Sequence, residues 1–430
     1  MALATLVSSR ASSKIAVDYL IISDTDGSGV AFAASRARLL TLNGRSVAIA
    51  SRFGRDWATR PNVELMRPAL ERLAEAFNPV NVELIDIAVD NDHPMQWVEA
   101  LAWFAATVNA RVAVYDAHPS TRAMVQELIA RGMYTVAASN NADVAEALGL
   151  MQSSDEWVRR LGIVAMVADR DASALRYAAR EELEQRYLPL ANAMDVLVRQ
   201  PQLLPGEPAS IRYLGDQGRV AAILAEQPTL LEELAGRLEY PPARLAREAA
   251  EVIEVGNVAV LARLDGTKAA MWVPKTLEQL ALIHRRDAVV AIVHGVDRRT
   301  GREYWDVQLL RYWLGSVQPE EVERIVAELA QRHNATWRFS GGYGSVRFSD
   351  ARAAEEAAKY AFERLAGMRS TAAHLVSDSV VASAIQRDYR RIMELLERIA
   401  AALEKGAEAK EEQVRLLREL YQRDERTRYD

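Results

Sequence analysis

Short apolar segments alternate with amphipathic segments over the first 170 residues, and this alternation limits the folds open to the chain. Apolar runs predict strands at 19–22, 46–50, 84–89, 112–115 and 134–137. Helical periodicity lies between them at 30–40, 61–77, 95–109 and 142–148. Strands that are apolar along their whole length are typical of a parallel sheet covered by helices on both faces. The sequence therefore predicts an α/β fold with a parallel sheet.

Aspartates follow the apolar runs of this region. The carboxyl ends of parallel strands share one edge of a sheet, so we expect these side chains to converge there. Carboxylates suit one or two divalent cations, and glycines at a helix start let a phosphate approach backbone N–H groups. Metals in such a site polarise a phosphoryl group and activate water, which indicates a metallophosphoesterase geometry. The residues are Asp24, Asp26, Asp90, Asp116 and Asp169 (after the run 161–168), with His118 two positions after Asp116 and Gly27, Ser28 and Gly29 opening a helix.

The composition restricts the metal and the partners. The chain has no cysteine, which excludes disulfides, Cys-ligated zinc and iron–sulfur clusters. Oxygen-rich ligand sets suit Mn or Mg better than softer metals. The net charge is −6, so a nucleic-acid site has to be a local groove. Only six of the 53 basic residues are lysine, a bias that suits phosphate contacts but equally reflects genome composition or a thermophilic host.

Four segments are expected along the 430 residues. We assign 1–173 to the parallel-sheet α/β domain and 174–275 to a helical connector. A smaller α/β domain is expected at 276–368, with strands near 289–293 and 305–310, a helix at 319–332, a Gly-rich strand at 338–348 and a helix at 351–365. A helical or coiled-coil tail is expected at 369–430.

The connector and the tail each leave two interpretations open. Helices at 229–238 and 243–255, followed by strands at 258–263 and 269–273, resemble a winged helix-turn-helix. Glu248, Glu251 and Glu254 make the second helix a poor face for DNA phosphates, which favours a structural role over DNA reading. In the tail, apolar residues from 385 to 403 follow a heptad seam. That seam fits a helical hairpin or docking surface, and equally a helix folded back on its own domain.

The order of these motifs resembles the DHH phosphoesterase superfamily, which includes RecJ exonucleases, nano-RNA phosphodiesterases, type II pyrophosphatases and the Cdc-type component of the CMG replicative helicase. The matching segments are 23–27, 89–91, 115–119 and 167–169, and in the second α/β segment Leu310-Arg311 and the turn Gly341-Gly342-Tyr343-Gly344. The resemblance implies metal ligands at Asp24, Asp26, Asp90 and Asp169. It implies phosphate or substrate contacts from His118, Arg311, Gly341, Gly342 and Gly344, with His118 the catalytic candidate in an active protein.

Two metal ligands of the active family pattern are missing. The positions two and four residues before Asp24 hold Ile22 and Leu20, where active members have a His or Asp. Ala117 stands where the family has the first, metal-binding His of its third motif, and Tyr343 stands where its glycine loop has His. A site that lacks two ligands binds metal weakly or incompletely, so we expect Mn or Mg to be weakly bound or absent. His93 could substitute, although a chance loop histidine is the simpler interpretation.

The resemblance and these departures lead to two hypotheses. The first is a non-catalytic, RecJ-like DNA-replication protein that bridges GINS and MCM and binds single-stranded DNA. The second is a Mn-dependent single-strand exonuclease or nano-RNase, and small-molecule phosphoesterases form a third class. With no apolar run of about 18 residues and no signal peptide, a cytoplasmic protein without a membrane span is expected.

Overall fold

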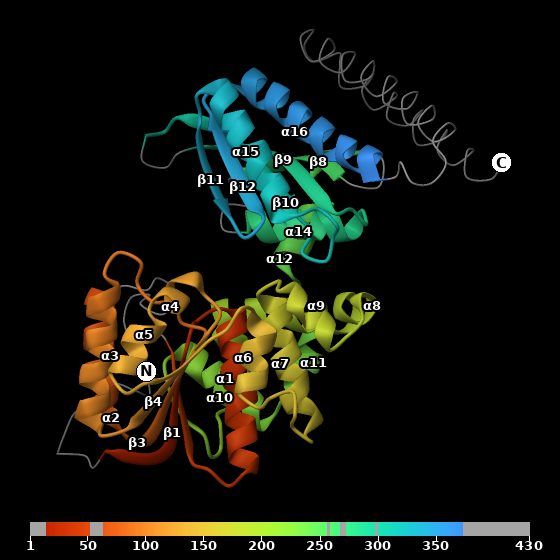
Figure 1. Ribbon diagram of the computed structural model, residues 1–430. Coiled ribbons are helices and arrows are strands. Elements are labelled where there is room, and N and C mark those ends of the chain that lie inside the picture. Colours follow the sequence, from red (N-terminus) through yellow and green to blue (C-terminus); the bar gives the residue numbers. More distant parts are fainter. Residues whose placement is uncertain (1–13, 52–62, 256–258, 267–271, 297–299, 373–430) are drawn as a thin grey trace. The chain divides into compact units, whose positions relative to one another are not determined.

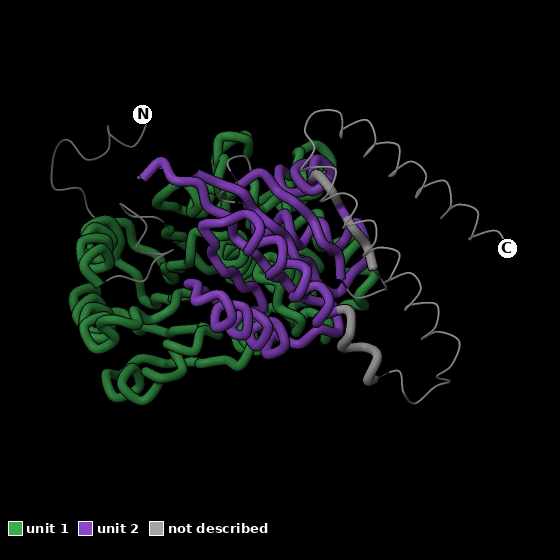
Figure 2. The backbone as a smooth tube through the Cα atoms, turned by 90° about the horizontal axis from the view of Figure 1, so that it is seen from above, with its two compact units in different colours: residues 1–240 green, residues 241–430 purple. Residues whose placement is uncertain are grey.

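The computed structural model describes residues 14–51, 63–255, 259–266, 272–296 and 300–372 (Figure 1). The chain divides into two compact units, residues 1–240 and 241–430, which Figure 2 shows in different colours. Each unit contains one six-stranded sheet. The α/β fold class expected from the sequence is confirmed, with a parallel sheet, helical regions and a second sheet. The predicted tail lies outside the described residues beyond Ala372.

The first sheet is parallel throughout and has the strand order β5-β4-β3-β1-β2-β6. Four residues of β2 and most of β1 are buried, because helices cover both faces. The strands are β1 (Ile15–Ser23), β2 (Val47–Ala50), β3 (Phe77–Ile85), β4 (Arg111–Asp116), β5 (Tyr134–Ala137) and β6 (Arg212–Leu214).

Helices α2 and α3 pack on one face of this sheet, and α1, α7 and α10 lie on the other side (Figure 1). Trp97 and Phe104 of α3 and Leu70 of α2 are completely buried in the first layer. The helices of this unit are α1 (Gly27–Leu42), α2 (Val63–Ala76), α3 (Pro94–Val108), α4 (Pro119–Ala123), α5 (Val125–Ala130), α6 (Asn141–Ala147), α7 (Glu156–Ala168), α8 (Arg180–Glu182), α9 (Leu188–Arg199), α10 (Asp216–Glu226) and α11 (Thr229–Ala235), with the 3₁₀ turns Ala172–Arg176 and Pro201–Leu203 and the π-helix Leu183–Tyr187.

The second sheet is mixed, with the order β11-β12-β10-β9-β8-β7 and one parallel pair, β8 with β9. Helices α15 and α16 pack on one face, where Val307, Val326 and Phe362 belong to a common apolar core. The elements are α12 (Pro241–Arg247), β7 (Ala250–Val255), β8 (Ala259–Asp265), α14 (Val273–Ile283), β9 (Ala288–Val296), β10 (Glu303–Arg311), α15 (Pro319–His333), β11 (Thr336–Ser340), β12 (Tyr343–Phe348) and α16 (Ala351–Ala372).

Three expected elements are wrong in type or extent. The segment 250–255 is strand β7 paired with β8, not the second half of a helix, because Val252, Ile253 and Val255 favour a strand that a sheet can pair. The apolar run before Asp169 is helix α7, not a strand. The third strand spans 77–85 and not 84–89, so its carboxyl end precedes Asp86. Most of the strand expected at 269–273 lies outside the described residues, and Val273 begins α14.

Among the described residues, no helix combines the length and the apolar character needed to cross a bilayer.

Candidate metal centre

Strand register brings three aspartates to one level at the carboxyl edge of the first sheet. Ser23 of β1 pairs with Ile85 of β3, and Ile85 pairs with Tyr115 of β4. The residues that follow them are Asp24, Asp86 and Asp116. Asp86 is 4% exposed and Asp116 is fully buried. The sheet therefore concentrates carboxylates where the sequence analysis expected them, with Asp86 in the position that we had assigned to Asp90.

The turn after β1 places Asp26 at the start of α1. Its Oδ1 accepts hydrogen bonds from the N–H groups of Ser28 and Gly29, each at 3.0 Å, which caps the helix. Gly29 has to be glycine because a Cβ there would lie 2.8 Å from the Asp24 Cβ and 2.9 Å from the Asp24 carbonyl oxygen. This close approach folds the Asp24–Asp26 turn onto the helix.

Ser28 joins two carboxylates of the site. Its Oγ lies 2.7 Å from Asp26 Oδ1 and 2.8 Å from Asp86 Oδ2. A hydroxyl has one hydrogen to donate, so it cannot satisfy two ionised carboxylates at once. A proton on Asp86 or a cation between the acids resolves this conflict.

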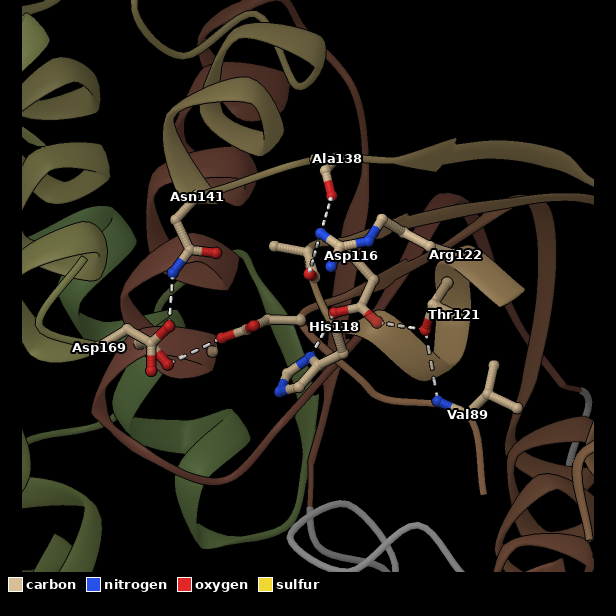
Figure 3. A network of polar contacts seen from close by, with 12 residues as sticks. Val89, Asp116, His118, Thr121, Arg122, Ala138, Asn141 and Asp169 are labelled. Atoms are coloured by element: carbon tan, nitrogen blue, oxygen red, sulfur yellow. Dashed lines mark hydrogen bonds and ion pairs between the residues drawn. The ribbon is translucent and has the colours of Figure 1, made fainter. Parts of the chain in front are cut away.

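His118 completes the cluster on the other side of Asp116 (Figure 3). The His118 Nδ1 lies 2.6 Å from Asp116 Oδ1, and Thr121 Oγ1 donates to Asp116 Oδ2. Possible ligand atoms of Asp86, Asp116 and His118 all lie within 4.8 Å of one another. His118 therefore stands among the carboxylates, where it can act as a metal ligand as well as in the phosphate contact expected from the sequence.

Asp169 joins the cluster from the end of α7 rather than from a strand. Its Oδ2 accepts a 2.7 Å hydrogen bond from Asn141 Nδ2 at the start of α6 (Figure 3). The charge of Asp169 raises the pKa of Asp86, and the charge of Asp26 raises the pKa of Asp169. The structure therefore brings Asp24, Asp26, Asp116, Asp169 and His118 together, with Asp86 added to the expected set.

Burial and the crowding of like charges raise the pKa values of these groups. Burial and then the neighbouring Asp26 carboxylate raise the pKa of Asp24 to about 8. Burial raises the pKa of Asp86 well above its usual value, and Asp169, Asp26 and Asp116 raise it further. Burial and Asp26 raise the pKa of Asp169 to about 6. Buried carboxylates with raised pKa values are stabilised by a divalent cation, so the donor set fits Mn²⁺ or Mg²⁺.

The same groups give a pH dependence. The pKa of Asp24 rises to about 8 on folding, and the Asp116 hydrogen bond raises the pKa of His118 to about 9. Groups with raised folded-state pKa values stabilise the fold at low pH and lose that contribution as pH rises through the folded value. We expect the free energy of unfolding, measured by urea titration in EDTA, to fall from pH 5 to pH 9. Added Mn²⁺ should flatten the decline, and a profile that rises over this range would contradict the charge arrangement.

Asp90 has a different environment from the cluster. Its carboxylate accepts hydrogen bonds from the N–H groups of Val63, Asp92 and His93 at 2.8–3.1 Å. Burial raises its pKa, but these hydrogen bonds outweigh burial and leave the pKa below its usual value. The His93 Nδ1 lies 3.8 Å away from it. These contacts hold the start of α2 against the loop before α3, so the role that they give Asp90 is structural.

The second unit contains the predicted substrate arginine and glycine turn in direct contact. Gly341 and Gly342 have positive φ angles of 59° and 90° in the β11–β12 turn. A Cβ on Gly342 would lie 2.7 Å from the side-chain Nε of Arg311. The backbone N–H of Arg311 donates a hydrogen bond to the Gly342 carbonyl at 3.0 Å. Arg311 Nε is buried without a hydrogen-bond partner. Gly344, the third predicted glycine, packs on Val326 of α15 and is core.

Comparison with known proteins gives structural matches alone, since no protein-family model and no curated protein matches the sequence. A Mn²⁺ complex of RecJ from Thermus thermophilus matches with a TM-score of 0.37 and 13% identity, covering 80% of this chain and 52% of that one. CDC45 from Entamoeba histolytica matches with a TM-score of 0.28 and 7% identity, covering 81% and 95%. Exonuclease RecJ bound to manganese matches with a TM-score of 0.32 and 14% identity, covering 82% and 90%.

RecJ and CDC45 are the kinds of protein that the motifs resemble. The likeness suspected from the sequence is confirmed as a likeness to these structures, at identities that concern the fold alone. The chain spans about half the length of the Thermus RecJ.

Proposed function

We propose that this chain is a RecJ-like protein that holds one divalent cation and binds single-stranded nucleic acid without cleaving it efficiently. The observation that carries the proposal is the composition of the acidic cluster, where five aspartates surround a single histidine. Ala117, beside that histidine, has no group that can bind a metal.

One cation is what the donors support. Asp26, Asp86, Asp116, Asp169 and His118 would hold it, and it would neutralise the acids and attract a phosphate oxygen. On the side of Asp24, the preceding β1 positions are the fully buried Ile22 and Leu20, which offer no donor for a second ion. Two-metal hydrolysis needs both ions close together, so chemistry at a one-ion site is impaired.

The cation and Arg311 supply phosphate contacts of different kinds. Asp26 caps α1 and accepts the N–H groups of Ser28 and Gly29, so it is the positive charge of the cation that would attract a phosphate to the acids. Arg311 lies against the glycine turn with its Nε unpaired. Arginine is well suited to a phosphodiester, because its planar guanidinium can donate two parallel hydrogen bonds. Each of these features, taken by itself, suits contact with a nucleic-acid backbone.

A replication role with GINS-like and MCM-like partners is the most specific form of this proposal. It is supported by the resemblance of the Asp116-Ala117-His118 motif to the Cdc-type helicase component. Co-purification of the tagged chain with a GINS-like protein from its own host would support that role. Recovery of the chain without such a partner, under conditions that preserve GINS–MCM complexes, would count against it.

Restoring the missing histidine tests whether the site is impaired. We expect Ala117→His to raise Mn²⁺-dependent cleavage of a fluorescent single-stranded oligonucleotide by at least about tenfold, because a metal ligand next to His118 is regained. Ala117→Ser, which adds a polar atom without an imidazole, is the control and should leave cleavage at the native level. High native activity together with no gain from Ala117→His would refute the impaired-site proposal.

A Mn²⁺-dependent exonuclease or nano-RNase is the second candidate, and Asp86 favours it. The sequence predicts Asp90 as the acid of the third strand, whereas the buried Asp86 follows that strand and lies among the other carboxylates. In that case the cation would activate water, and His118 would contact the phosphate. Robust native turnover that Asp86→Asn abolishes would establish this second function.

A further inference from the structure

A pocket of about 300 Å³ lies in the first unit, formed by residues of α7, the turn after it and the π-helix. Its polar lining consists of Glu156, Arg159, Arg160, Tyr177, Arg186 and Tyr187. Three of these side chains are cationic and one is anionic. Pockets of this size accept a small ligand. None of these residues belongs to the acidic cluster.

Arg160 is the most buried of the three arginines and is held in one orientation. It is 7% exposed, and its guanidinium stacks on Trp157 with 4.0 Å between the guanidinium carbon and the ring centroid. Its Nη2 pairs with Glu232, while its Nε is buried without a hydrogen-bond partner. A buried guanidinium N–H with no acceptor is costly, and an anion in the pocket would supply one.

Two guanidiniums already share a carboxylate oxygen at this pocket. Glu156 Oε1 lies 3.8 Å from Arg160 Nη1 and 3.2 Å from Arg186 Nη2. The Glu156 side chain is 63% exposed, so it can swing into solvent at little cost. Burial and then the charge of Arg186 lower the pKa of Arg160. Glu156 therefore occupies the position that a small external anion would take.

The backbone also has an unusual form beside the pocket. Leu183–Tyr187 is a π-helix, in which the N–H of Leu188 donates to the carbonyl of Leu183, directly before Pro189. π-Helices are rare in proteins, and those that occur are often found at functional sites. This one places Arg186 and the buried Tyr187 in the pocket lining.

We propose that this pocket binds a phosphate group, either as inorganic phosphate or as the terminal phosphate of a small phosphomonoester, between Arg160 and Arg186 with displacement of Glu156. Guanidinium groups pair with phosphate through charge-assisted hydrogen bonds, which are the strong ones. Tyr177 and Tyr187 border the same space and leave room for a small organic group on the phosphate.

The test is isothermal titration calorimetry of the full chain in EDTA, so that no metal-bound phosphate at the acidic cluster contributes. Inorganic phosphate and a nucleoside 5′-monophosphate are titrated separately, with chloride at equal ionic strength as the blank. Whichever of the two binds more tightly identifies the source of the phosphate. Native protein should bind at one site per chain.

Variants then assign the binding to the pocket. Arg186→Gln, at a side chain outside the apolar core, should weaken binding about tenfold, and Arg160→Met should weaken it at least as much. Glu156→Gln should strengthen it. Arg180→Gln, on the neighbouring helix outside the lining, is the matched control and should bind as the native chain does. Absence of binding in the native chain, or equal affinities for Arg186→Gln and Arg180→Gln, would overturn the proposal.

Discussion

Replacing Asp86 by Asn is expected to weaken Mn²⁺ binding by about a hundredfold, because changing residues that merely support a metal ligand already costs about 10–100-fold in affinity. Asp86 is 4% exposed and shares the Ser28 hydroxyl with Asp26. Asn keeps the shape and can still hydrogen bond to Ser28, but it has no charge to offer a cation. Calorimetric titration with MnCl₂ measures the change.

Asp90→Asn is the matched control for this prediction. The Asp90 carboxylate accepts three backbone hydrogen bonds between α2 and α3, and the amide oxygen of Asn can keep the two from Asp92 and His93, although its NH2 group cannot accept the one from Val63. We expect Mn²⁺ affinity to stay within about twofold of the native value, which is less than about 0.5 kcal/mol. A large loss of affinity in Asp90→Asn with little loss in Asp86→Asn would show that Asp90, and not Asp86, is the metal ligand.

Gly29→Ala is expected to destabilise the chain by about 3 kcal/mol, the upper part of the usual range for overpacking. The added Cβ would meet the Asp24 Cβ at 2.8 Å and the Asp24 carbonyl oxygen at 2.9 Å. Backbone atoms cannot rotate aside, so the Asp24–Asp26 turn has to move. Urea unfolding should show a lower midpoint at an unchanged slope, and Mn²⁺ affinity should fall with it.

Gly236→Ala is the control, because it adds the same methyl group without a clash. The atoms nearest to its Cβ are carbonyl oxygens 3.8 and 3.9 Å away, and its φ angle of −75° suits any residue. We expect a change within about 0.5 kcal/mol, as for ordinary surface substitutions. Equal destabilisation by the two substitutions would show that the close approach at Gly29 is unimportant.

The alternation of apolar runs and aspartates was sufficient to predict five strands of the first sheet and most of its acids, but not β6, which lies in the expected helical connector. Asp24 and Asp26 follow β1 and Asp116 ends β4 as expected, because a buried parallel strand needs an apolar sequence and its end needs a polar turn. Asp169 was placed correctly in the cluster but on the wrong element. An apolar run of eight residues does not distinguish a buried helix from a buried strand.

Asp86 was missed because the boundary of its strand was misplaced. Asn78, Pro79 and Asn81 are poor strand formers, so the apolar run appeared to begin at Leu84. In the fold, β3 starts at Phe77 and pairs with β1 from Ile15 onwards, and that register ends the strand before Asp86. Pairing with a neighbour is tertiary information that a single sequence does not carry. The signal available was a second Asp four residues before Asp90.

Anomalous difference density from a crystal soaked with MnCl₂ tests the central claim most directly. One manganese ion contacting Asp86 and Asp26, with no second ion beside Asp24, is the result that a binding site of impaired chemistry predicts. Two well-occupied ions bridged by these carboxylates would contradict it, because that arrangement supports metal-activated water and hydrolysis.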